Sequence, residues 1–420
     1  MDHDAQNKNN SEWKRNAGFF IGGQFVSMFG SMLVQHAITW HITLKTQSGV
    51  WMTLFTCAAL LPMVLVSPFA GVWADRHNRK YLINIADAAI AIITLILAVL
   101  FFMGYENILL MLIAVMIRSF GQGIQQPAVS ALIPQIVPGE QLTRFNGIQS
   151  SVQSLTMFAA PMLSGVLLTL LPIEYIFFID VITAAIGISV VFFFVHVHHS
   201  NKEKDLDQSI GAYIEEIKVG LRYIGGKPWL KVLMGYTAFF SVFATPAAML
   251  TPLQVARTFG DDVWRLAAIE IGFALGMTAG GIAISIWGGF RNKVHTIIMA
   301  CIAFGLTTVL FGVVPNFWLY LFIMLLCGAA MPMFNTPAMT LMQTNIDPLV
   351  MGRVFSVLMM INGLAMPIGM TIFGPLGDVV RIESMLIVAG ILLLISGFSL
   401  FTFKSLDEVG VLATGQHEAK

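Results

Sequence analysis

Twelve apolar segments, each long enough to cross a lipid bilayer, constrain the fold of this chain more than any other feature. A spanning helix needs about 20 apolar residues, and 57% of the 420 residues are hydrophobic whereas 11% are charged. Soluble globular proteins carry about a quarter charged residues. We therefore predict an all-α membrane protein with 12 transmembrane helices at 17–41, 51–73, 81–103, 107–126, 147–171, 173–195, 229–254, 264–288, 295–314, 317–338, 353–376 and 383–403.

The positions of the basic residues predict how the chain is oriented. With the N-terminus placed in the cytoplasm, eighteen Lys and Arg residues fall at inner segments and four at outer loops. Basic residues concentrate on the cytoplasmic side of membrane proteins. The sequence therefore predicts a multi-pass protein of the cell membrane with both termini in the cytoplasm.

The two halves of the chain resemble each other. The segment PAVSALIPQIVP at 127–138 matches PAMTLMQTNIDP at 337–348, an offset of 210 residues. This repeat predicts two pseudo-symmetric six-helix bundles, an architecture in which two halves rock about a site near the bilayer midplane. The predicted organisation is a tail at 1–16, a bundle at 17–195, a linker at 196–228, a second bundle at 229–403 and a tail at 404–420. Apolar residues at helical spacing from 210 to 224 indicate an amphipathic helix in the linker.

Several function classes lack support in the sequence. The net charge is formally zero, which gives nucleic-acid binding no electrostatic basis. A phosphate-binding Walker loop is missing from the sequence, so a nucleotide is not the expected energy source. Cys57, Cys301 and Cys327 fall inside apolar runs and are interpreted as small hydrophobic residues. We expect no enzyme activity, no metal and no cofactor; the expected partners are protons, membrane lipids and a small amphipathic solute.

Motifs in the right order on the right spans resemble the major facilitator superfamily, and over the whole chain its macrolide-efflux branch. Between spans 2 and 3 the sequence GVWADRHNRK carries the Gly, Asp and basic cluster of that superfamily, with Asn78 in place of the usual second Gly; we expect Asn78 to tolerate a left-handed backbone there. Span 4 carries Arg118 in IRSFGQGIQQPAVSALIPQIVPGEQL, with Gln122 where the wider superfamily has Gly. The antiporter signature of span 5 is degraded to Ala-Pro-x-x-Ser-Gly at 160–165.

The resemblance implies a gate on the cytoplasmic side. Asp75 is expected to face the positive end of span 11, near Arg353, and to hold the inner side closed. The other gating candidates are Gly71, Arg76 and Arg79. A solvated loop charge is the alternative interpretation of Asp75, because exposed ion pairs contribute little.

Ionisable residues inside spans are costly and are candidates for proton coupling. Arg118 lies near mid-depth in span 4, where it either tunes a neighbouring acid or is satisfied by carbonyl groups around Gly121 and Gly123. Asp180 has no obvious partner within its own span. Asp87 is near the cytoplasmic end of span 3 and could pair with Arg79 or Lys80 as a structural residue.

Glu270 is the main candidate for the proton carrier. It lies early in span 8, followed by Gly272, Gly276 and Gly280, a stripe of small residues that lets another helix approach closely. A carboxyl group held out of water there could load a proton from outside and release it inward. The alternative is a carboxylate paired with Arg265 or Arg257.

The leading functional hypothesis is a secondary transporter that exports bulky amphipathic drugs, macrolides first, by proton antiport with alternating access. The alternatives are an exporter of an endogenous metabolite such as a siderophore or a lipid precursor, a proton-linked importer, and, as a third class, a sensor or membrane enzyme. Soft and aromatic side chains suit varied ligands, although each of them could equally fill a core or face lipid. The substrate-binding candidates are Phe25, Met28, Tyr236, Phe239, Phe243, Met359 and Met360.

Overall fold

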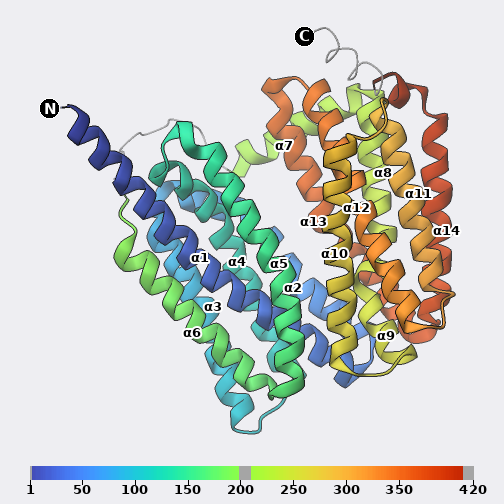
Figure 1. The fold of residues 1–420 in the computed structure, drawn as a ribbon, viewed down its shortest axis with the longest axis horizontal. Coiled ribbons are helices and arrows are strands. Elements are labelled where there is room, and N and C mark those ends of the chain that lie inside the picture. The colour runs from blue at the N-terminus through green and yellow to red at the C-terminus, as the bar shows by residue number, and fades with distance from the viewer. Residues whose placement is uncertain (1, 198–209, 410–420) are drawn as a thin grey trace. The chain divides into compact units, whose positions relative to one another are not determined.

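The computed structural model describes residues 2–197 and 210–409, and every regular element in these ranges is helical (Figure 1). Twelve of the helical segments are long and apolar enough to cross a membrane. The predicted all-α fold with 12 transmembrane helices is therefore confirmed. The chain divides into two compact units, residues Met1–His41 with Ala58–Ile210, and Ile42–Cys57 with Gly211–Lys420.

The first unit is built mainly from the first six spans. Its elements are α1 (Asp2–Thr46), α2 (Gly49–Arg76), α3 (Arg79–Phe102), α4 (Ile108–Ile136), the 3-10 turn η1 (Gly139–Gln141), α5 (Leu142–Leu170) and α6 (Ile173–Phe194). Helix α3 packs against both α4 and α6. The start of α2 and the end of α1 belong to the second unit.

The second unit contains the remaining elements. They are α7 (Ile210–Gly226), α8 (Pro228–Thr245), the π-helical turn η2 (Pro246–Leu250), α9 (Thr251–Thr258), α10 (Val263–Trp287), α11 (Lys293–Phe311), α12 (Phe317–Asn345), α13 (Pro348–Val379), α14 (Ile382–Ser399) and the 3-10 turn η3 (Leu400–Thr402). The seventh span is one apolar stretch, α8 to α9, and the π-helical turn interrupts it at Pro246 because proline lacks a backbone N–H.

Many large apolar side chains point outward. Ile286, Leu170 and Phe193 are 83%, 71% and 68% exposed. Such exposure over long helices would be unfavourable in water and is expected where the surrounding solvent is lipid. The packing therefore agrees with the apolar composition.

The same capping device starts the corresponding helices of the two units. The side chain of Asn78 accepts a hydrogen bond from the backbone N–H of Lys80 at the start of α3, and Asn292 accepts one from Val294 at the start of α11. Helix α11 packs against α12 and α14 as α3 packs against α4 and α6. The expectation of a left-handed backbone at Asn78 is wrong: its φ is −63°. Asn is favoured there because its side chain satisfies an N–H that has no helical partner.

Two spans extend furthest beyond their predicted C-terminal ends. Helix α4 runs to Ile136 and α12 runs to Asn345, past the predicted ends at 126 and 338. Both contain internal prolines, at Pro127 and Pro134 in α4. Transmembrane helices tolerate internal proline when neighbouring groups satisfy the freed carbonyls. The repeated segment thus lies at the C-terminal ends of the two helices.

The predicted glycine stripe is the contact between α10 and α12. A Cβ atom at Gly276 would lie 2.0 Å from the carbonyl oxygen of Leu325, and one at Gly280 would lie 2.3 Å from that of Ala329. These distances are far inside van der Waals contact, so the two backbones touch. Only glycine permits this approach. Glu270 lies on the same helix, α10, which cannot move away from α12 without losing this contact.

Replacing Gly276 by Leu is expected to prevent normal packing of the second unit. Overpacking a well-filled site costs about 1–3 kcal/mol, and here the obstacle is backbone that cannot move aside. We expect a large loss of monodisperse protein in size-exclusion chromatography. Gly281→Leu on the same helix is the matched control, because no atom lies within 4 Å of a Cβ at Gly281; equal yields of the two variants would contradict the stated role of the stripe.

Candidate functional site

A buried ion pair lies in the middle of the first unit. Arg118 of α4 and Asp180 of α6 form a salt bridge of 2.5 Å, and their side chains are 1% and 0% exposed. Arg118 also donates to the hydroxyl of Thr94 on α3 and to the backbone carbonyl of Ser31 on α1, the latter at 3.2 Å. Four helices are therefore tied to one guanidinium group. Arg118 is thus the partner of Asp180 that the sequence did not identify. The hydrogen bonds of Arg118 go to Thr94 and Ser31, and not to the carbonyl groups around Gly121 and Gly123.

A polar cavity of about 350 Å³ lies beside this ion pair, within the same unit. Ser31 belongs to both, because its hydroxyl donates to Asp180 at 3.1 Å and its side chain lines the cavity. Two of the predicted substrate-binding residues, Phe25 and Met28, also line it. The ion pair carries no net charge. It therefore holds the side chain of Ser31 at the cavity wall without adding a net charge to the cavity.

Asp87 supplies the carboxyl group of this cavity. It is 5% exposed, and the side chains of Gln24 and Gln125 lie within hydrogen-bonding reach of it. These two amides also bond to each other, Gln125 donating to Gln24 at 2.8 Å. The expected pairing of Asp87 with Arg79 or Lys80 is wrong. Lys80 instead donates to backbone carbonyl groups of Phe192 and Val195, both at 2.7 Å.

Glutamine is the most frequent residue type in the rest of the cavity wall. Six glutamines line it from three helices, namely Gln24, Gln122, Gln125, Gln126, Gln149 and Gln153. An amide in a membrane span is unfavourable unless it is hydrogen-bonded, so this concentration of amides is unusual for an apolar bundle. The sequence analysis missed these residues because it considered only ionisable ones. The signal was present as glutamines at spacings of three or four in spans 4 and 5.

Glu270, in the second unit, is half-buried on α10. Within the described ranges it makes neither a hydrogen bond nor an ion pair. Its two predicted alternative partners are engaged elsewhere: Arg265 contacts Asp262 at 3.3 Å, and Arg257 contacts Asp378 at 2.9 Å. The interpretation of Glu270 as half of an outer-end ion pair is therefore wrong, and its carboxyl group is left for another role.

Asp378 organises one end of the second unit. Its carboxylate accepts hydrogen bonds from the hydroxyl of Ser48 and from the backbone N–H groups of Gly49 and Val50, at 2.7–2.9 Å, besides its contact with Arg257. The first N–H groups of a helix have no helical partners. Asp378 of α13 thus caps the start of α2 within this unit.

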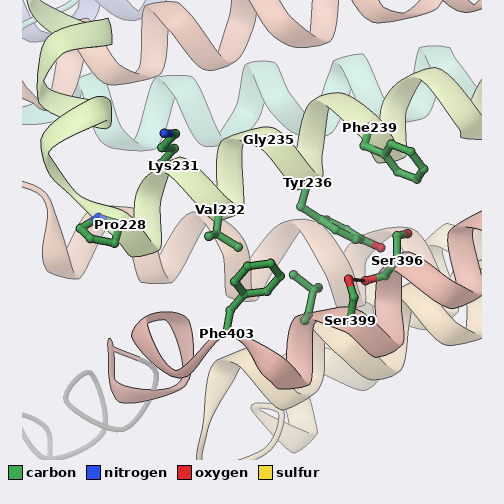
Figure 2. Close-up of a pocket in the computed structure, with 10 residues that line it drawn as sticks. Pro228, Lys231, Val232, Gly235, Tyr236, Phe239, Ser396, Ser399 and Phe403 are labelled. Atoms are coloured by element: carbon green, nitrogen blue, oxygen red, sulfur yellow. Dashed lines mark hydrogen bonds between the residues drawn. The ribbon is translucent and has the colours of Figure 1, made fainter.

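An apolar groove of about 530 Å³ lies between α8 and α14. Two predicted substrate-binding residues, Tyr236 and Phe239, line it (Figure 2). Figure 2 shows the ring of Tyr236 lying between the two helices with its hydroxyl directed at Ser396. The ring also stacks on Phe240, with centroids 6.2 Å apart. Four of the predicted substrate-binding residues therefore line two separate hollows: Phe25 and Met28 the cavity of the first unit, and Tyr236 and Phe239 the groove of the second.

The remaining substrate-binding candidates lie on α8 and α13. The ring of Phe243 contacts those of Phe239 and Phe373, with centroids 4.3 and 5.8 Å apart. Met360 is half-buried and Met359 is 77% exposed. Phe243, Met359 and Met360 do not line the groove that contains Tyr236. Their role in substrate binding stays a prediction.

The gating candidates are described only in part. Arg79 donates to the backbone carbonyl groups of Ala74 and Ala131, at 3.0 and 2.8 Å, which fixes the turn between α2 and α3. Gly71 has open space around its Cα. The side chains of Asp75 and Arg76 lie outside the described part of the structure, so the latch stays a prediction.

Arg353 contacts the amphipathic helix through its backbone. A Cβ at Gly220 of α7 would lie 2.7 Å from the carbonyl oxygen of Arg353 on α13. The close approach requires glycine at position 220. Helix α7 is therefore packed on the second unit.

The fold resembles solved transporters. A POT family transporter in complex with 5-aminolevulinic acid superimposes with a TM-score of 0.70 at 12% identity, covering 93% of this chain and 96% of that one. The nucleoside transporter NupG superimposes with a TM-score of 0.60 at 16% identity, covering 93% of this chain and 100% of that one. At these identities the likeness concerns the fold alone.

The sequence model of the Major Facilitator Superfamily matches residues 20–370. The chain belongs to the major facilitator superfamily. It is therefore a multi-pass transporter of this superfamily, and the predicted resemblance is confirmed.

Macrolide efflux protein A of Streptococcus pyogenes is 27% identical over 387 residues, covering 91% of this chain and 95% of that protein. The protein of the same name from Enterococcus faecalis is 28% identical, covering 74% and 96%. The Staphyloferrin A transporter of Staphylococcus aureus is 22% identical, covering 89% and 92%.

Proposed function

We propose that this transporter exports bulky, amphipathic, amine-bearing compounds of the macrolide type in exchange for protons, by alternating access. The observation that carries the proposal is the cavity of the first unit, whose lining includes six glutamine amides and one carboxyl group, that of Asp87. Amides offer donors and acceptors to a ligand rich in hydroxyl and carbonyl groups. A buried carboxylate with no ion-pair partner offers a place for one positive charge.

One carboxyl group can serve both a proton and a substrate. The Arg118–Asp180 pair is neutral as a whole, so the charge of the cavity wall follows the protonation of Asp87. Ionised Asp87 attracts an ammonium group, and protonated Asp87 does not. A substrate cation that binds must therefore displace the proton, and a proton that binds must release the substrate, which is the requirement for antiport.

Glu270 is proposed as the second proton-accepting group, in the second unit. It makes no ion pair in the described ranges, so its charge is not compensated when it is ionised. A carboxyl group in that position favours binding a proton when it is held away from water. Its place early in the eighth span, near the predicted outer end, suits a group that receives protons from outside.

The energy available from protons is sufficient for export. Exchange of one proton for one substrate cation moves no net charge, but with a second proton on Glu270 one elementary charge crosses per cycle. At 100 mV this releases about 2.3 kcal/mol, which corresponds to roughly 50-fold accumulation of the substrate. The names of the relatives support the substrate class, since the two macrolide efflux proteins match over most of their length. The Staphyloferrin A transporter favours a second candidate, export of an iron-chelating metabolite.

The test uses everted membrane vesicles that contain the full chain. Their lumen is acidified by respiration, and a fluorescent dye reports the pH difference. Adding a macrolide with a basic amine is expected to dissipate part of that difference only in vesicles containing the transporter, and cells that produce it should tolerate more of the drug. Dissipation equal to that of vesicles lacking the chain would contradict the proposal. A response to an iron chelator alone would favour the second candidate.

A further inference from the structure

A second hollow of the first unit has a different character from the glutamine cavity. It is a groove of about 520 Å³ between α1 and α5, which run alongside each other (Figure 1). Its walls are apolar along most of their length. The lining residues are Trp13, Lys14, Ala17, Gly18, Ile21 and Gly22 of α1, Gln141 of η1, and Arg144, Phe145 and Ile148 of α5.

The basic residues of the groove lie toward one end of it. Lys14 and Arg144 are on the N-terminal side of most of the apolar lining residues of α1 and α5. From Lys14 to Gly22 the groove follows α1 for about 12 Å at 1.5 Å per residue. Because the N-terminus is predicted to be cytoplasmic, this basic end faces the predicted cytoplasmic side and the apolar end faces the membrane interior. Trp13 lines the basic end, and tryptophan is common at membrane interfaces.

Two glycines make the groove hollow. No atom lies within 4 Å of a Cβ placed on Gly18 or on Gly22. The neighbouring Gly23 is different, because its Cβ would contact Gly187 and Val191 of α6 at 3.1 Å. Gly23 thus serves helix packing, whereas Gly18 and Gly22 leave room that no side chain fills. Ala17 and Phe145, each 4% exposed, form the floor.

The charge at the mouth is positive and uncompensated. Lys14 and Arg144 both line the groove, and the ten lining residues include no acid. Lys14 contacts the ring of Trp13 at 6.0 Å, and within the described ranges neither basic residue forms an ion pair. Two exposed cations above an apolar slot complement an anionic headgroup above an acyl chain.

We propose that this groove binds one anionic phospholipid of the cytoplasmic leaflet. Its phosphate contacts Lys14 and Arg144, and one acyl chain lies in the slot over Gly18 and Gly22. Ile21 lines both this groove and the glutamine cavity. A lipid in this groove would therefore contact a residue that also lines the proposed substrate site. Lipid binding to the groove does not depend on which compound is transported.

The test is native mass spectrometry of the purified full chain with phosphatidylglycerol and phosphatidylcholine of identical acyl chains. The wild type should prefer phosphatidylglycerol. Lys14→Gln/Arg144→Gln should weaken phosphatidylglycerol binding roughly tenfold or more, because each basic residue near a membrane surface contributes about fivefold. Gly22→Leu fills the slot and should weaken binding with the charges unchanged. Glycerol phosphate, which has no acyl chain, should not compete.

The controls separate this site from general effects of charge and folding. Arg291→Gln/Lys293→Gln removes two basic residues of the second unit and should leave lipid binding unchanged. Gly22→Leu meets open space, so its melting temperature should equal that of the wild type. Equal binding of the two lipids to the wild type would overturn the proposal. Unchanged phosphatidylglycerol binding in either groove variant would overturn it as well.

Discussion

Arg118→Met should be the most damaging single substitution in the first unit. It leaves the carboxylate of Asp180 fully buried without its partner, and breaking a buried ion pair costs about 3–5 kcal/mol. It also removes the hydrogen bonds to Thr94 and to the carbonyl group of Ser31. We expect a sharp fall in melting temperature and in the yield of monodisperse protein in detergent.

The double variant Arg118→Met/Asp180→Leu separates the contribution of the ion pair to stability from its contribution to transport. With both charges removed, much of the stability should return, because apolar side chains of similar size can replace a buried ion pair. Transport should not return, since Ser31 would lose the partner that holds it at the cavity wall. A double variant as unstable as Arg118→Met alone would show that the lone charge of Asp180 is not the cause.

Glu270→Gln should remove proton coupling while leaving the protein folded. Gln keeps the size of the side chain and cannot carry a proton across, and among the residues that the structure describes Glu270 has no ion pair to lose. In everted vesicles the substrate-dependent loss of the pH difference should fall to the level of vesicles without the chain, and the roughly 50-fold accumulation available from 100 mV should disappear. Substrate binding to the purified variant should stay at the wild-type affinity.

Glu215→Gln is the control for this substitution. Glu215 lies on α7, where its side chain is 67% exposed and forms an ion pair with Lys218, three residues along the same helix. Its replacement should leave coupling unchanged. If Glu270→Gln retains full coupling, the assignment of Glu270 as a proton carrier is wrong.

The fold could be predicted because each step rests on one strong signal. Apolar length defines the spans, and the repeat of Pro127 and Ala128 at Pro337 and Ala338 indicates the duplication. The stripe from Gly272 to Gly280 predicted a close helix contact, which α10 and α12 make. These signals are local in the sequence, and lipid leaves few alternatives to helices.

The site was less predictable because its contacts join distant spans. The partner of Arg118 lies 62 residues away in another helix, and no spacing within span 4 points to it. Asp87 was assigned to the basic residues nearest in sequence, whereas the fold places it among amides of α1 and α4. Glutamines went unnoticed because they carry no charge, although an amide is also costly in hydrocarbon.

Proton release on substrate binding tests the central claim, that a proton and a substrate cation compete for Asp87. Purified transporter in weakly buffered detergent is mixed with a macrolide that bears a basic amine, at a pH near neutrality, and the pH change is recorded. The wild type should release protons when substrate binds, and its affinity should fall as the pH is lowered because protonated Asp87 no longer attracts the amine. Asp87→Asn should release no proton and should bind at least tenfold more weakly, since it lacks the carboxylate. Equal proton release by Asp87→Asn and the wild type would contradict the account.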